Sequence, residues 1–143
     1  EGIIETYVHT GGKLGVMVEI NCETDFVAKR PEFTDLAKAV AMQIAASPTV
    51  EFVSVDDIPE EVREKEKQLE MGAEDLAGKP DEIKAKIVEG RVGKLMKARC
   101  LLEQPYIKDP SQNVEELLKS TIATLGENIK IARFARMELG MSD

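Results

Sequence analysis

The side chains that could carry out chemistry are few in this chain, and they are scattered. His9 is the single histidine, and the two cysteines, Cys22 and Cys100, lie 78 positions apart without a C-x-x-C spacing. A metal site needs His, Cys or carboxylate ligands at short, regular spacings, and this pattern does not provide them. We therefore interpret the cysteines as buried thiols, with a single disulfide as the alternative.

The remaining candidates for catalytic chemistry also have simpler explanations. The glycine-rich stretch 11–15 lacks the G-x-x-x-x-G-K-[ST] spacing of a phosphate-binding loop, and no helix follows it. His9 has no acid or nucleophile at positions typical of a triad and is interpreted as a surface residue. The paired carboxylates at 56–57 and 60–61 coincide with a predicted helix start. No catalytic residue, metal or cofactor is predicted, so we do not expect an enzyme.

One hexapeptide is unusual for the residue types that it brings together. Residues 24–29, TDFVAK, directly follow a predicted strand and make one helical turn before Pro31. In one interpretation Asp25 caps the turn and Phe26 packs into the core. In the other, Phe26 projects from the turn and anchors the chain in a pocket of a partner protein.

The elements that would position this hexapeptide belong to one domain. The chain has 143 residues, with 19 Lys or Arg and 27 Asp or Glu, which give a formal charge of −8. At 43% hydrophobic residues it is too apolar for a disordered chain, and no apolar run reaches the length of a membrane span. The acidic balance argues against direct binding of nucleic acid or an anionic membrane. We expect a single domain, 1–143.

Periodicity predicts strands at both ends of the chain and helices between them. Alternating residues 4–9, the turn at Gly11-Gly12 and residues 13–22 predict a hairpin. Helical spacing follows from Pro31 to the Ser47-Pro48 break, and a short extended stretch is expected at 50–55. A mostly charged helix with only a thin apolar stripe and a second helix at 81–102 form an excursion at about 57–102, which is followed by a loop at 104–111. Asn113 and Glu116 suggest a capping box for a helix that ends at Gly126, and residues 129–139 predict a third strand.

These elements predict an α+β fold. The N-terminal hairpin and the C-terminal strand would form a three-stranded antiparallel sheet, with several helices packed on one face in a two-layer arrangement. Apolar side chains are also expected on the sheet face opposite the main core, at Tyr7, Met17 and Phe134. Because the helices can cover only one face, we expect this second face to pack against another copy of the chain.

Residues 19–29, EINCETDFVAK, resemble the signature of the elongation factor Ts family. Further similar segments occur in the family's order along the chain, so the resemblance covers nearly all of it. These segments are GII at 2–4 with Tyr7, LLEQPY at 101–106 with Lys108-Asp109, LGENI at 125–129, Arg133-Phe134 and ELG at 138–140.

The resemblance implies a guanine-nucleotide exchange factor that acts in translation elongation. Its expected partner is elongation factor Tu, in the GDP-bound and nucleotide-free states. In the family, Asp25 and Phe26 of the signature act as a wedge that disturbs the Mg²⁺ and phosphate site of elongation factor Tu. The contact residues carried over to this chain are Thr24, Asp25, Phe26, Val27, Lys29, Leu125 and Gly126.

Two departures from the family pattern bear on this expectation. Members usually begin with a small helical domain, whereas this chain opens at the first core strand, which suggests a processed or truncated form. Longer members carry two related sheet subdomains, so the chain resembles the short type, which pairs as a homodimer. The alternative function is a ribosome-associated or structural protein without exchange activity. The family implies a bacterial cytoplasm, or a plastid stroma or mitochondrial matrix.

Overall fold

The sheet is built from the two ends of the chain. A computed structural model describes residues 1–141 and contains three long strands, β1 (Gly2–Val8), β2 (Leu14–Asn21) and β5 (Lys130–Glu138). Their order is β1-β2-β5, and both pairings are antiparallel. Gly11 and Gly12 connect β1 to β2 with positive φ angles of 97° and 70°, a conformation that favours glycine. The predicted α+β class and the three-stranded antiparallel sheet are therefore confirmed.

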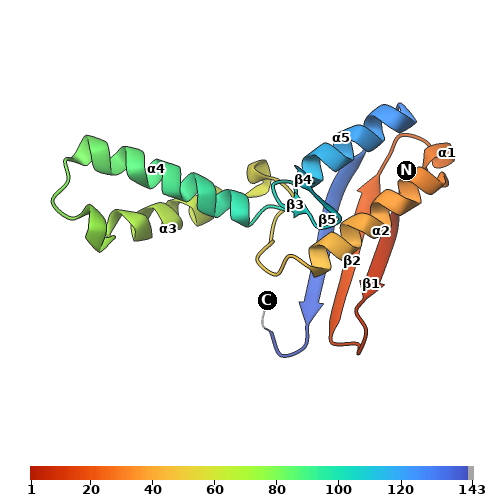
Figure 1. The fold of residues 1–143 in the computed structure, drawn as a ribbon, viewed down its shortest axis with the longest axis horizontal. Helices are drawn as coiled ribbons and strands as arrows, with labels where there is room; N and C mark the ends of the chain where they lie inside the picture. The colour runs from red at the N-terminus through yellow and green to blue at the C-terminus, as the bar shows by residue number, and fades with distance from the viewer. Residues whose placement is uncertain (142–143) are drawn as a thin grey trace.

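Two helices cover one face of this sheet (Figure 1). Helix α2 (Pro31–Ala45) packs against β1 and β2, and α5 (Val114–Leu125) packs beside α2. Pro31 occupies the first turn of α2, where its missing N–H has no partner to lose. The Asn113 side chain accepts from the Glu116 amide at 2.8 Å and completes the predicted capping box at the start of α5.

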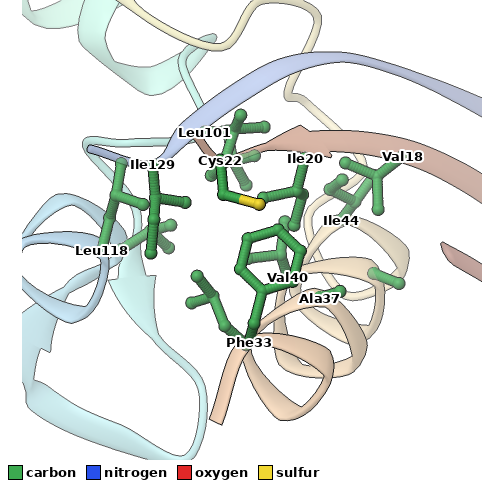
Figure 2. Close-up of a cluster of buried hydrophobic side chains, with 14 of the residues drawn as sticks. Val18, Ile20, Cys22, Phe33, Ala37, Val40, Ile44, Leu101, Leu118 and Ile129 are labelled. Atoms are coloured by element: carbon green, nitrogen blue, oxygen red, sulfur yellow. The ribbon is translucent and has the colours of Figure 1, made fainter. Parts of the chain in front are cut away.

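The main core lies between the sheet and these two helices (Figure 2). Alternate residues of β2 point into it, as expected for a strand with one buried face. Phe33 of α2 is fully buried at the centre, and Ile129 enters from the start of the C-terminal strand region. The largest labelled members of this core in Figure 2 are Val18, Ile20, Phe33, Val40, Ile44, Leu101, Leu118 and Ile129.

The predicted second face of the sheet needs a correction. Tyr7 lies opposite Val16, and Phe134 lies opposite Val18, so both belong to the helix-covered face and pack against the core. The pairing of β2 with β5 changes register at one point. Glu19 of β2 lies opposite Arg133, but the next residue, Ile20, lies opposite Ile131, which leaves Ala132 as an extra residue in β5. Such a bulge reverses the alternation of every residue that follows it. A parity count from Ile131 therefore places Phe134 on the wrong face.

The open face nevertheless carries apolar side chains. Met17 does face away from the helices and is 52% exposed, between Thr6 and Ala135 in the neighbouring strands. Other large apolar residues on this face are more exposed still, and they are Ile4, Val8 and Met137. We call this surface, made of Ile4, Val8, Met17, Ala135 and Met137, the open face.

A pair of helices projects from the sheet layer as an arm (Figure 1). Helices α3 (Glu60–Met71) and α4 (Asp81–Ala98) pack against each other, joined through the short 3-10 helix η2 (Glu74–Leu76). A second 3-10 helix, η1 (Val55–Asp57), precedes α3. We call residues 55–100 the arm and the rest of the described chain the body. A small cluster of buried apolar residues fills the arm, namely Ile58, Leu76, Val88, Val92, Met96 and Cys100.

Two local predictions between the arm and the body were wrong. The expected extended stretch at 50–55 contains an isolated parallel bridge, between Phe52 and Cys100, before η1 begins at Val55. That bridge also ends α4 at Ala98, before the predicted Leu102, because Leu101 N–H donates to the Phe52 carbonyl at 2.8 Å. The expected loop at 104–111 contains a two-stranded sheet of β3 (Pro105–Tyr106) and β4 (Asp109–Asn113). The side-chain oxygen Oε1 of buried Gln43 in α2 accepts from Ile107 N–H at 2.9 Å and fixes this small sheet to the body.

Both cysteines are free thiols and buried, as predicted. Burial raises the pKa of Cys22 and of Cys100 above the ordinary thiol value. Within residues 1–141 no helix combines the length and apolarity of a membrane span.

Candidate functional site

The signature hexapeptide forms a single helical turn at one end of the sheet. This turn, α1 (Asp25–Ala28), begins where β2 ends and stops just before α2. Thr24 is its cap, because the Thr24 hydroxyl accepts from Val27 N–H at 3.3 Å. The expectation that Asp25 caps the turn was wrong. Asp25 instead forms an exposed ion pair with Lys29, with Nζ and Oδ2 2.9 Å apart.

The turn presents its aromatic side chain to solvent. Val27 and Ala28 point into the core and are 6% and 5% exposed. Successive residues of a helical turn are separated by about 100°, so the two core-facing residues direct Phe26 outward. Phe26 is 87% exposed, the highest value among the large apolar side chains of the described residues. The interpretation that Phe26 packs into the core is therefore wrong.

The second predicted contact segment lies at the same end of the molecule. Helix α5 ends at Gly126, which adopts a left-handed φ of 74°, and Gly126 N–H donates to the Ile122 carbonyl at 2.8 Å. This conformation reverses the chain direction into β5 and favours glycine over residues with a side chain. Leu125 is half-buried against the core, and Gly126 itself is exposed. In Figure 1 the end of α5 lies beside α1.

Two glutamates join these segments, and their role was not predicted from the sequence. Glu127 Oε1 accepts from the amides of Glu23 and Thr24 at 3.2 and 3.1 Å, and Glu127 Oε2 accepts from the Thr24 hydroxyl at 2.6 Å. In return, Glu23 accepts from Asn128 N–H at 3.1 Å. We call these contacts the Glu127 bridge. No short-range sequence signal identifies it, because its partners are more than 100 positions apart.

The electrostatics of the site follow from these contacts. Hydrogen bonds, chiefly from the Thr24 hydroxyl, lower the pKa of Glu127, so the bridge contains a carboxylate at neutral pH. The hydrogen bond to Asp25 raises the pKa of Lys29. Burial raises the pKa of the Cys22 thiol beneath the site, with a further contribution from the charge of Glu127. The thiol donates to the Thr24 carbonyl at 3.2 Å and acts as a local structural group.

The site offers a binding surface built on a rigid base. Thr24, Asp25, Phe26, Val27, Lys29, Leu125 and Gly126 all lie at this end of the body, with Val27 supporting the turn from inside. Of the three residues predicted for a subunit contact, only Met17 lies on the open face. Within residues 1–141 no group of three or more His, Cys, Asp or Glu side chains is arranged to hold a metal ion. An exposed aromatic on a supported turn can dock into an apolar pocket of another protein.

The comparisons with known proteins agree with the resemblance in the sequence. The profile of the family described as "Elongation factor TS" matches residues 1–141. Elongation factor Ts of Picosynechococcus sp. is 62% identical over 140 residues, which are 98% of this chain and 64% of the relative. The chloroplastic elongation factor Ts of Guillardia theta is 60% identical, with the same coverage. The protein from Gloeothece citriformis is 61% identical, and the match covers 49% of it. The chain thus spans about half to two thirds of these relatives, and it belongs to the elongation factor Ts family.

Proposed function

We propose that this member of the elongation factor Ts family binds elongation factor Tu and promotes release of its GDP. The observation that carries the proposal is the exposure of Phe26, which is 87%, on a turn fixed to the core by its neighbours. A large aromatic that a supported turn holds in water offers apolar area for a partner to bury, as the anchoring residues of protein interfaces do. The name of the family indicates that this activity serves translation elongation.

The mechanism follows from differential binding. A GTPase with a phosphate-binding loop holds GDP through its phosphates, backbone amides and Mg²⁺. A factor that binds the nucleotide-free or distorted state more tightly weakens GDP binding by the same factor. In this proposal Phe26 acts as a wedge beside the Mg²⁺ and phosphate site, with Asp25, Lys29 and the Leu125-Gly126 corner in contact alongside. No covalent step is required, so the protein acts as a binding partner and not as an enzyme.

The test compares GDP release and folding in the same samples. Truncation of an aromatic hot spot costs about 2 to 4 kcal/mol, so Phe26→Ala should weaken binding of nucleotide-free elongation factor Tu by about 30-fold to 1,000-fold. The thermal midpoint should stay unchanged, because Phe26 contributes little to the core. Ile107→Ala, at another exposed apolar residue, is the matched control and should leave release of labelled GDP unchanged.

The same assay separates this function from the alternative of a ribosome-associated or structural protein. If the wild-type chain leaves the rate of GDP release from elongation factor Tu unchanged, the exchange function is contradicted. Normal exchange by Phe26→Ala would contradict the wedge while leaving an exchange role intact. The relatives named above are two cyanobacterial proteins and one chloroplastic protein, which supports a proposed place of action in a bacterial cytoplasm or a plastid stroma.

We also propose that two copies pair through the open face. Ile4, Val8 and Met137 are 60%, 68% and 74% exposed there, and together with Met17 they form an apolar surface without cover in the monomer. Met17→Glu would bury an unpaired charge in such an interface and should shift the chain to a monomer in light scattering. Leu69→Glu, which adds the same charge on the arm, should leave the dimer intact. A wild-type monomer at micromolar concentration would contradict the proposal.

A further inference from the structure

The contact segments of the proposed site are far apart in sequence and close in space. Glu127 lies directly after the Gly126 corner and accepts three hydrogen bonds from the start of α1. Glu23 makes the reverse contact, to the amide of Asn128. The backbone on each side therefore donates to a carboxylate on the other. Reciprocal contacts of this kind fix two segments in orientation as well as in distance.

The Thr24 hydroxyl couples this bridge to the helical turn itself. A hydroxyl has a single proton, and here that proton is donated to Glu127 at 2.6 Å. The oxygen lone pairs remain free to accept from Val27 N–H, which is the capping bond of α1 at 3.3 Å. Donation to a carboxylate polarises the hydroxyl and strengthens its acceptor side. Loss of the carboxylate would therefore loosen the cap and the corner together.

The turn needs such external support. A helical segment of four residues is unstable alone, because the cost of its first turn is not repaid by further turns. Burial of Val27 and Ala28 holds the inner side of α1 in the core. Phe26 itself is 87% exposed and has no packing that would fix its direction. The direction of Phe26 thus depends on the backbone at Thr24, which the Glu127 bridge holds.

We propose that Glu127 is a positioning residue for the wedge. It keeps Thr24 and α1 in the orientation that presents Phe26, and it holds the Leu125-Gly126 corner at a fixed distance from that side chain. This inference rests on the proposed exchange function, and it adds Glu127 as a residue that acts through Phe26. Preorganisation favours binding because the ordering cost is met before the partner arrives.

The effect on exchange follows from the population of competent molecules. If the free turn presents Phe26 correctly in only about a tenth of molecules, the apparent affinity falls about tenfold. Glu127→Ala should therefore weaken binding of nucleotide-free elongation factor Tu about tenfold, with faster hydrogen exchange of the Thr24 and Val27 amides. Glu115→Gln removes a carboxylate at the other end of α5, where it pairs with Lys119, and should change neither quantity.

A double-mutant cycle with Phe26→Ala decides the case. In the Phe26→Ala background Glu127→Ala should have almost no further effect, since the side chain to be positioned is gone. A tenfold loss that persists in that background would show that Glu127 acts by a route other than Phe26, and it would overturn the inference. Unchanged binding by Glu127→Ala in the wild-type background would also overturn it. The thermal midpoint of each variant shows whether binding is lost because the protein unfolds. If Glu127→Ala unfolds, Glu127→Gln, which keeps one acceptor oxygen, replaces it in the same cycle. No effect of Phe26→Ala itself would instead contradict the proposed wedge.

Discussion

The body and the arm are both folded around apolar clusters, but these clusters differ greatly in size. The body buries eighteen apolar residues in one cluster between the sheet and α2 and α5, whereas the arm buries six. Helix α3 has no buried residue at all, and α3 and α4 pack mainly on each other. Because stability is distributed along a structure according to such burial, the arm should open locally while the body stays folded.

The larger apolar cluster makes the body the more stable of the two regions, and the proposed site lies in the body. Phe26 and Gly126 lie at an end of the body that is anchored by Val27, Cys22 and Ile129 of the main core. A wedge must resist the force with which it displaces groups of its partner, and a close-packed base provides that resistance. The arm is joined to the body by backbone bonds around Phe52 and Cys100 and by an Arg99–Glu51 ion pair. It is therefore suited to motion relative to the site.

The largest effect is expected in the body. Phe33 is fully buried beneath the site, and Phe33→Ala should destabilise the protein by about 3 to 5 kcal/mol through lost burial and a cavity. Urea unfolding followed by far-UV circular dichroism measures this loss. Phe26→Ala is the matched control, because the same substitution at an exposed position should change stability by less than about 0.5 kcal/mol. Equal losses for the two variants would contradict the division between core and binding surface.

A smaller effect, confined to the arm, is expected for Met96→Ala. Met96 is fully buried in the arm cluster, and its truncation should cost the arm about 2 to 5 kcal/mol. Cys100, whose thiol donates to the Met96 carbonyl at 3.2 Å, should then react faster with a thiol reagent. Cys22, buried in the body, should react at its wild-type rate.

The control for this experiment is Leu95→Ala, because Leu95 is the neighbouring residue and is 38% exposed. It should leave both labelling rates near their wild-type values. If Met96→Ala accelerated the labelling of Cys22 and Cys100 equally, the arm and the body would open as one unit, which would contradict a separate local opening of the arm.

The sequence predicted those features of the two regions that depend on local patterns. The alternation in β2 and the capping box of α5 are short-range signals, and both elements were predicted correctly. The thin apolar stripe of the first helix in the segment 57–102 indicated a helix with little burial, as α3 has. In the candidate site, the signature suggested that Phe26 projects, and its neighbours Val27 and Ala28 explain why it does.

The remaining features depend on contacts that no local pattern records. The bulge at Ala132 arises from pairing with β2, and it moved Phe134 to the helix-covered face. The Glu127 bridge joins residues from opposite ends of the chain. Two prolines suggested a loop at 104–111, where contact with Gln43 stabilises a small sheet. In each case tertiary contact overrides or adds to the local preference.

The smallest expected effect concerns acid and the surface charges of the arm. Arg91 forms ion pairs with Asp75, after α3, and with Glu70 of α3, and so ties α4 to its partner helix. The hydrogen bond from Arg91 lowers the pKa of Asp75 below its usual value. A carboxyl with a lowered folded-state pKa contributes stability above its unfolded pKa, and this contribution is lost as the pH falls through the folded-state pKa. Because these groups are exposed, the contribution is small and is screened by salt.

Acidification from pH 7 to about pH 3 should therefore loosen the arm, since Asp carboxyls titrate near pH 4 when unperturbed. Hydrogen exchange of α4 amides, corrected for the intrinsic pH dependence, measures this opening. Asp75→Asn should open the arm slightly at pH 7 and flatten the change on acidification, because the titrating group is gone. Glu66→Gln, which removes a carboxylate from α3 that makes none of the Arg91 contacts, is the control and should keep the wild-type profile. A pH profile of Asp75→Asn identical to wild type would show that the Arg91–Asp75 ion pair does not contribute to the stability of the arm, and it would contradict this prediction.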